Sequence, residues 1–380
     1  MDKVLLINQS SGYLVYDFAE SLSSHYEVSL IAGGDVALKP FLSKVFSFIS
    51  YNRSNSLSRL FSWLLFSFRC LIHLLFNPFK YKHIILFSNP PLLVFFLFPW
   101  SGRTTYIFFD LYPDAFRSIG NYGFISFLQI LWIKLSTPIF SRMNAIVFIS
   151  DEMKTSFSKS YGFHHLSSFR MPVIPLWADS KVASSFTLPI KSPSDGYLSK
   201  SVCFFYSGNF GHTHPLENIA SAFSTLSRGF SFQLNLFGSG ACFNRVLKIS
   251  RCVSSITVGS ALSHQDYIAH LKHSDVGVIC IDAISGHVSL PSKLFAMLVS
   301  GLPILAVAPK NSSLAKMVVK YECGIVVQPD DIDDIANAFI SLGNNKDLRI
   351  QLGKNAFKAA SFFSKANADL LFEVITNDKK

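Results

Sequence analysis

Short apolar runs alternate with longer amphipathic stretches along almost the whole chain. Such runs suit strands buried on both faces, so the pattern predicts parallel sheets covered by helices, an α/β fold. The predicted strands of the first half are Val4–Ile7, Val28–Ala32, Ile84–Phe87, Thr105–Phe109 and Ala145–Ile149. Those of the second half are Val202–Tyr206, Phe232–Phe237, Ile256–Val258, Val276–Ile281, Ile304–Val307 and Gly324–Val327.

The alternation stops between residues 180 and 200, where Lys191–Gly196 is a polar turn cluster. A length of 380 residues also fits two domains better than one. We predict an N-terminal domain over 1–185, a linker over 186–200, a C-terminal domain over 201–355 and a helical segment over 356–380, with its helix near Asn355–Phe372.

The stretch 291–307 combines a helix start, a helix end and a strand. Ser292 and Lys293 follow Pro291 in the first turn of the predicted helix, and Gly301 ends it. Backbone N–H groups beside a hydroxyl and an ammonium form an anion site that suits a diphosphate. The alternative is an ordinary capped helix of an α/β domain.

Two glycine-rich turns follow apolar strands in the second half. Gly208 and Gly211 in the first turn, and Gly238 and Gly240 in the second, permit close approach of a ligand to the backbone. The second turn lacks a third glycine at dehydrogenase spacing, so a nicotinamide site is not expected. Possible donors around the first turn are Ser207, Asn209, His212 and His214.

In the first half, Asp110 ends an apolar strand and Gly12 occupies the first strand–helix turn. Ligands of doubly wound sheets bind at the carboxyl ends of strands, so Asp110 is a candidate for function; a turn or helix-capping aspartate is the alternative. The acidic run Asp330–Asp334 directly precedes a predicted helix and suits its dipole better than a metal. His164 and His165 lack partners at ligand spacing, so no metal site is predicted.

The composition is 49% hydrophobic and only 15% charged, with 38 phenylalanines and a net charge of +10. Either the core is rich in phenylalanine or some surface is apolar. No acidic residue lies between Asp35 and Asp110, an interval that holds the apolar stretch Leu60–Phe76. A basic, aromatic, amphipathic stretch is typical of an interfacial membrane helix, and a core helix is the alternative. The residues predicted to contact an anionic membrane surface are Arg53, Arg59, Trp63 and Arg69.

Other partners and compartments are less favoured by the sequence. The basic charge comes without a nucleic-acid-binding motif, so no nucleic acid partner is expected. The most apolar run, Ile84–Trp100, is broken by prolines and is not expected to span a membrane. The run after Asp2 is predicted to be a strand rather than a signal peptide. The six cysteines show no paired spacing, which favours a reducing compartment. We expect a cytoplasmic protein, peripheral on the inner face of the cell membrane.

Together the motifs of the second half resemble the donor-binding half of a retaining GT-B glycosyltransferase of family 4. In the first half, Phe87–Leu93, Phe108–Asp114 and Ile174–Asp179 resemble the bacterial branch that makes O-antigen, capsule and colanic acid. The resemblance covers roughly residues 3–360. It implies two Rossmann-like, doubly wound parallel-sheet domains facing a central cleft, with the last helix crossing back to the N-terminal domain.

The resemblance also implies an activity. A hexosyl or N-acetylhexosaminyl group would pass from a nucleotide sugar, expected to be UDP-linked, to a polyprenyl-diphosphate-linked saccharide. The reaction would serve bacterial lipopolysaccharide or other surface polysaccharide biosynthesis. It would need no metal or other cofactor. Asp110 would orient or deprotonate the acceptor hydroxyl, with Asp114 as the second choice and Tyr112 lining the pocket. The implied donor-binding residues are Gly12, Ser207, Gly208, Asn209, His212, His214, Gly238, Gly240, Pro291, Ser292 and Lys293.

The chain departs from this family in two respects. The family's paired glutamates would fall at Val288 and Ala296, and neither residue is acidic. The usual basic residues of the glycine-rich turn would fall near Asn209 and His214. Two alternatives therefore stay open: a nucleotide-sugar 2-epimerase on the same fold, and a non-catalytic scaffold subunit.

Overall fold

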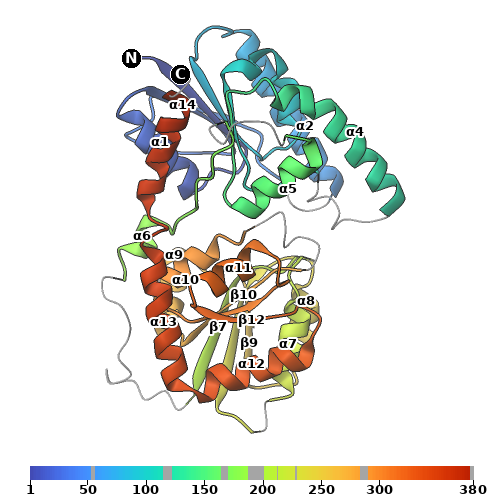
Figure 1. Cartoon of the computed structure of the whole chain (residues 1–380), viewed down its shortest axis with the longest axis vertical. Coiled ribbons are helices and arrows are strands. Elements are labelled where there is room, and N and C mark those ends of the chain that lie inside the picture. The colour runs from blue at the N-terminus through green and yellow to red at the C-terminus, as the bar shows by residue number, and fades with distance from the viewer. Residues whose placement is uncertain are drawn as a thin grey trace. The chain divides into compact units, whose positions relative to one another are not determined.

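The computed structural model describes residues 1–52, 56–113, 122–163, 170–186, 201–211, 213–226, 229–282 and 290–376, with backbone alone at 56 and 122–126. The chain divides into two compact units (Figure 1). The first unit joins Met1–Pro175 to Lys365–Lys380, and the second is Leu176–Ser364. The division thus falls at Pro175, ahead of the predicted linker over 186–200, of which 187–200 lies outside the described residues.

The first unit is built on a parallel sheet in the order β3-β2-β1-β4-β5-β6. The order reverses between β1 and β4, whose register places Val4 between Val28 and His83. Every strand predicted for this half is present. The strands are β1 (Lys3–Asn8), β2 (Glu27–Gly33), β3 (Lys44–Phe48), β4 (His83–Phe87), β5 (Thr104–Ile107) and β6 (Ala145–Val147).

Strand β3 was not predicted from the sequence. It lies at the edge of the sheet, and none of its residues is fully buried. An edge strand needs fewer apolar residues, so its hydrophobic signal is weak. The helices of the first unit are α1 (Tyr13–Ser23), α2 (Ser56–Leu75), α3 (Leu93–Phe96), η1 (Phe98–Arg103), α4 (Tyr122–Phe140), α5 (Asp151–Tyr161), η4 (Lys365–Asp369) and α14 (Leu370–Thr376).

The C-terminal segment packs on α1. Lys365 forms ion pairs with Glu20 at 2.6 Å and with Asp17 at 3.5 Å, and the rings of Phe372 and His25 stack with centroids 4.0 Å apart. The single helix predicted near Asn355–Phe372 is in fact interrupted. Its first part belongs to α13 of the second unit, and the chain enters the first unit at Lys365.

The second unit repeats the architecture, with the sheet order β12-β11-β10-β7-β8-β9 and every pair parallel. All strands predicted for this half are present, and the order reverses between β7 and β10. The α/β prediction is therefore confirmed in both halves. The strands are β7 (Val202–Asn209), β8 (Phe232–Ser239), β9 (Ile256–Gly259), β10 (Val276–Cys280), β11 (Ile304–Val307) and β12 (Gly324–Val327).

Aromatic packing holds the helices on this second sheet. Phe204 of β7 meets Phe339 edge to face with centroids 4.8 Å apart, and Phe223 meets the same ring at 5.0 Å. Asp331 accepts a hydrogen bond from the Asp334 N–H at 2.9 Å, so the acidic run starts a helix as predicted. The helices are α6 (Ser180–Ala183), α7 (Leu216–Ser224), α8 (Phe243–Ser250), α9 (His264–His273), α10 (Lys293–Val299), α11 (Ser313–Lys320), α12 (Ile332–Asn344) and α13 (Lys346–Ala360).

Candidate functional site

The two glycine-rich turns lie side by side at the carboxyl edge of the second sheet. β7 and β8 pair along their length, with Gly208 opposite Gly238 and Asn209 opposite Ser239. The pairing continues beyond the strands, because the Phe210 N–H donates to the Ser239 carbonyl at 2.8 Å. The structure therefore brings together two turns that are distant in sequence.

Two glycines of the second turn, Gly238 and Gly240, are required by packing between the turns. A Cβ on Gly238 would lie 1.9 Å from the Gly208 carbonyl oxygen. A Cβ on Gly240, whose φ is +151°, would lie 2.5 Å from the Phe210 carbonyl carbon. At Gly208 it would lie 2.8 Å from the Tyr206 hydroxyl oxygen. Gly238 and Gly240 therefore let the backbones of the two turns meet, whereas the contact at Gly208 is with a side chain of its own strand. The presence of these glycines does not by itself indicate a ligand.

Lys293 begins α10 at the same edge of the sheet, after β10. Its Nζ lies 4.3 Å from the centroid of the Tyr267 ring, a cation–π contact with a buried side chain of α9. Surrounding protein atoms lower the pKa of the Lys293 ammonium, while the Asp179 carboxylate opposes this and favours the charged form. The lysine is thus held in place although part of it is exposed to solvent.

Helix α10 begins after Pro291 and ends before Gly301, as the sequence predicts. Ser292 has helical φ and ψ, and its side chain does not cap the helix. After the helix, Gly301 has a φ of +68° and its N–H donates to the Leu298 carbonyl at 2.9 Å. The Leu302 N–H donates to Met297 at 3.1 Å, which completes a Schellman motif. Pro291 is half-buried just ahead of this helix.

His214 lies in the turn between β7 and α7. Its Nδ1 is 2.9 Å from the Thr213 hydroxyl oxygen, and the Asp282 N–H donates to the Thr213 carbonyl at 2.8 Å. Burial lowers the pKa of His214, against the effect of the nearby Asp282 carboxylate. The imidazole is therefore neutral at pH 7 and offers a hydrogen bond rather than a charge. His212 lies outside the described residues.

The carboxyl edge of the first sheet carries a different set of groups. Gly12 precedes α1 in extended conformation, with a φ of −131°. Among the described residues, no heavy atom lies within 4 Å of where its Cβ would stand. Unlike Gly238 and Gly240, Gly12 is therefore not required by the packing of the chain, and its missing side chain leaves room beside the first turn.

Asp110 follows β5, which lies two strands from β1 and Gly12 along the same edge of the sheet. The backbone N–H groups of Phe109 and Asp110 donate to the Ser88 hydroxyl at 3.1 and 3.2 Å, which fixes the backbone after β5. Burial raises the pKa of the neighbouring Tyr112, the Asp110 carboxylate raises it further, and the Arg59 guanidinium lowers it. Asp110 and Arg59 each therefore lie close enough to Tyr112 to interact with it. Asp114 lies outside the described residues.

Helix α2 has an apolar core side and an apolar exposed side. Trp63, predicted to contact a membrane, is only 5% exposed and stacks on Tyr51 with centroids 6.0 Å apart, so that prediction is wrong. Its face packs inward together with Phe66 and Cys70. Arg69 is exposed and Arg53 lies outside the described residues. The large exposed apolar residues of α2 are Leu57, Leu60, Phe61, Leu64, Phe68, Ile72 and Leu75.

Among the described residues, Leu57–Leu75 is the one helical stretch whose length and composition would suit a membrane span, and 33% of it is buried in the fold. A core helix meets the same criterion. Helix α4 adds a second exposed apolar face that sequence reasoning missed, and the phenylalanines thus serve both core and surface. The large exposed apolar residues of α4 are Phe127, Leu128, Ile130, Leu131 and Leu135.

No family model matches the sequence, and no curated protein matches it either. Solved structures do match over nearly the whole chain. A sucrose-phosphate synthase from Thermosynechococcus elongatus has a TM-score of 0.72 at 13% identity, covering 99% of this chain and 98% of that one. Anabaena HepE in complex with UDP and glucose has a TM-score of 0.69 at 13% identity, covering 100% of each chain. WaaG, a glycosyltransferase involved in lipopolysaccharide biosynthesis, has a TM-score of 0.63 at 14% identity, covering 94% and 95%.

The fold is GT-B. Two doubly wound parallel sheets of six strands each match the two Rossmann-like domains of these glycosyltransferases, as the sequence predicted. In such sheets, ligands bind at the carboxyl edge where the strand order reverses. In the second unit this point lies between β7 and β10, where Asn209 ends β7 and Lys293 follows β10. In the first unit it lies between β1 and β4, beside Gly12 and Ser88.

Proposed function

We propose that the chain is a retaining glycosyltransferase that transfers a hexosyl or N-acetylhexosaminyl group from a UDP-sugar to a polyprenyl-diphosphate-linked saccharide. It would act on O-antigen or capsule at the inner face of the bacterial cell membrane, without a metal. The observation that carries the proposal is Lys293, held over Tyr267 at the point where the second sheet reverses its strand order.

In this proposal Lys293 binds the donor diphosphate. Helix α10 has seven residues, so its dipole is weaker than that of a long helix, and the lysine supplies most of the positive charge. When the bond between the anomeric carbon and UDP breaks, the leaving group gains negative charge. An ammonium held in place stabilises that charge without reorganising, which is electrostatic catalysis. Ser292 and the turn at Gly208 and Asn209 add hydrogen bonds.

Asp110 acts on the acceptor in the first unit. It orients the attacking hydroxyl and accepts its proton as the new bond to the anomeric carbon forms. The fixed backbone at Ser88 holds its position. Support for a lipid-linked acceptor comes from the exposed apolar faces of α2 and α4 in this unit. HepE, with UDP and glucose bound, supports a UDP-linked donor.

The test is UDP binding by isothermal calorimetry to the Lys293→Ala variant. We expect a loss of about 1–3 kcal/mol, the scale of a hydrogen bond to a charged group. That is a roughly 5- to 150-fold weaker affinity. The matched control is Lys320→Ala on α11, because Lys320 also lies over a tyrosine ring, 5.3 Å from the centroid of Tyr321. Unchanged UDP affinity in Lys293→Ala would refute the assignment.

Assays on the native protein distinguish this function from the two alternatives, a non-catalytic scaffold subunit and a nucleotide-sugar 2-epimerase. Ala296 is buried on α10, at the position where the related family has a carboxylate, so affinity for the nucleotide sugar rests on fewer charged contacts. Binding of UDP-sugar without release of UDP in the presence of a lipid acceptor would indicate a scaffold subunit. A change of configuration at C2 of the bound sugar would indicate the epimerase.

A further inference from the structure

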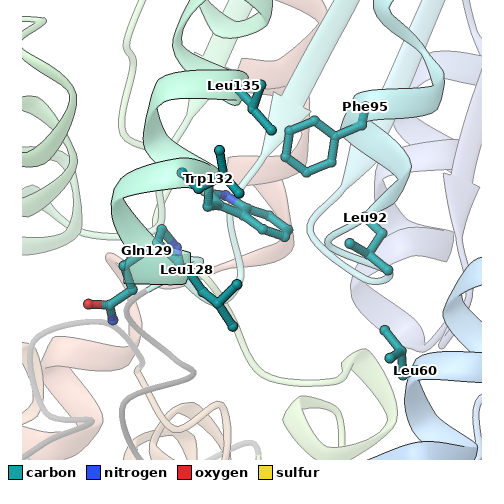
Figure 2. A pocket seen from close by; sticks show the side chains of 9 residues that line it. Leu60, Leu92, Phe95, Leu128, Gln129, Trp132 and Leu135 are labelled. Atoms are coloured by element: carbon teal, nitrogen blue, oxygen red, sulfur yellow. The ribbon is translucent and has the colours of Figure 1, made fainter. Parts of the chain in front are cut away.

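An apolar hollow opens between helices α2, α3 and α4 of the first unit (Figure 2). Its volume is about 410 Å³. Figure 2 shows Leu60 of α2 and Leu92 on one side of the hollow, with Leu128 and the Trp132 ring of α4 on the opposite side. Phe95 supports that ring edge to face, with centroids 4.8 Å apart. The lining residues are Leu60, Leu92, Phe95, Pro113, Leu128, Gln129, Leu131, Trp132 and Leu135.

The hollow is open rather than a defect inside the core. Leu128, Leu131 and Leu135 line it and are 44%, 40% and 53% exposed. The lining is hydrocarbon apart from Gln129, whose amide points away from the hollow in Figure 2. A concave, exposed apolar surface of this kind marks a binding site, because leaving it in water is unfavourable. A free sugar or nucleotide would find few hydrogen-bond partners there.

A cationic residue beside the lining in sequence narrows the choice of ligand for the hollow. Leu60 directly follows Arg59, and Pro113 directly follows Tyr112, so two lining residues are sequence neighbours of the interacting Arg59 and Tyr112. The Arg59 Nε is buried and has no hydrogen-bond partner among the described residues. Asp110, the proposed acceptor residue, interacts with the same tyrosine. The interval 36–109, which supplies α2 and α3, contains no acidic residue. The hollow therefore suits a hydrocarbon chain that ends in an anion.

We propose that this hollow, the α2–α4 pocket, binds the first isoprene units of a prenyl diphosphate, with the diphosphate beside Arg59. The inference rests on the proposed function and names the part of the protein that holds the lipid of its acceptor. A cavity of 150 Å³ accommodates benzene, so 410 Å³ has room for on the order of 15 carbon atoms, about three isoprene units. The sugar attached to the diphosphate then lies toward Asp110, where transfer takes place.

The first experiment measures how affinity depends on chain length. Isopentenyl, geranyl and farnesyl diphosphate are titrated calorimetrically into the full-length protein, below the concentration at which they form micelles. Each methylene transferred from water into an apolar site changes affinity by about fourfold. We expect farnesyl diphosphate to bind at least 100-fold more tightly than isopentenyl diphosphate. Equal affinity for the three compounds would overturn the proposal.

The second experiment compares two variants of α4, one with a new carboxylate inside the pocket and one with a new carboxylate outside it. Leu128→Asp puts a carboxylate in the pocket, and Ile130→Asp puts one on the same helix outside it, at a position that is 66% exposed. Because both sites are exposed and helical, the two changes carry similar risk for folding. We expect Leu128→Asp to abolish the dependence on chain length and Ile130→Asp to retain it. Equal loss in both variants would show non-specific adsorption to the apolar surface and would overturn the pocket.

UDP titration of the same samples separates this inference from the proposed function. If UDP binds with the expected dependence on Lys293 and prenyl diphosphates show no dependence on chain length, the pocket is wrong and the donor assignment stands. If Leu128→Asp weakens binding of farnesyl diphosphate and UDP does not bind, the pocket assignment stands and the proposed glycosyltransferase function is wrong. Binding to neutral phosphatidylcholine vesicles that is reduced equally by both aspartate variants would assign this surface to the bilayer instead.

Discussion

Gly12 offers a direct test of whether a ligand approaches the first sheet, because its substitution should separate stability from activity. The residue precedes α1 in extended conformation, which any amino acid can adopt, and no described atom lies within 4 Å of its missing Cβ. Gly12→Ser should therefore fit without strain. Serine is also a better residue than glycine before a helix, by a few tenths of a kcal/mol.

The expected gain in stability can be estimated. Replacing a glycine at a compatible position stabilises by about 0.4–1 kcal/mol through the unfolded state. With the better cap, the sum is about 1 kcal/mol, which corresponds to a rise in Tm of roughly 2–4 °C for a unit of this size. Transfer should nevertheless fall if Gly12 contributes to the proposed donor site, because the added Cβ and hydroxyl occupy the open space beside the backbone.

The assay combines differential scanning calorimetry without ligand and UDP release from the donor sugar with acceptor present. Gly240→Ser is the contrasting variant, since its φ of +151° and the Phe210 backbone leave no room for a side chain. It should lose about 1–3 kcal/mol of stability from backbone strain alone. If Gly12→Ser raises Tm and leaves transfer unchanged, no ligand approaches Gly12 and the reasoning fails. A lower Tm would show that Gly12 is structural.

Three further predictions follow from the same geometry. Asp110→Asn should reduce transfer by about 100-fold or more and leave UDP affinity and Tm unchanged; a parallel loss of Tm would make Asp110 structural. Because burial lowers the pKa of His214, its contribution to stability is complete above the unfolded pKa near 6.5 and is lost as the pH falls below it. Urea unfolding at pH 7.5 and 5.5 should therefore show a smaller loss on acidification for His214→Gln than for the native protein, and an equal loss would contradict this. Replacing Arg53 and Arg69 with Gln should weaken binding to anionic vesicles by roughly 30-fold at low salt, at about 1 kcal/mol per charge, and much less at 1 M salt. Sedimentation that is equal with neutral and anionic vesicles would show that charge does not recruit the protein.

The sequence by itself determined the elements and their class. Buried parallel strands are continuous apolar runs, and both sheets were predicted from them except for β3, a half-buried edge strand. Local chemistry also fixed the end of α10 at Gly301 and the start of α12 at Asp331, because helix ends depend on neighbouring residues only.

Tertiary structure decided what the side chains face. Helix α2 carries large apolar residues on both its buried and its exposed sides, so periodicity could not tell that Trp63 packs inward while Phe61 and Leu64 remain exposed. The glycines of the second unit looked alike in sequence, yet Gly238 and Gly240 are required by a strand pairing that brings their turns together, whereas Gly12 has open space beside it. The α2–α4 pocket also arises only in the fold, because residues from Leu60 to Leu135 meet there through packing. Local sequence determines which element forms, and contacts between distant residues determine which surfaces remain free to bind.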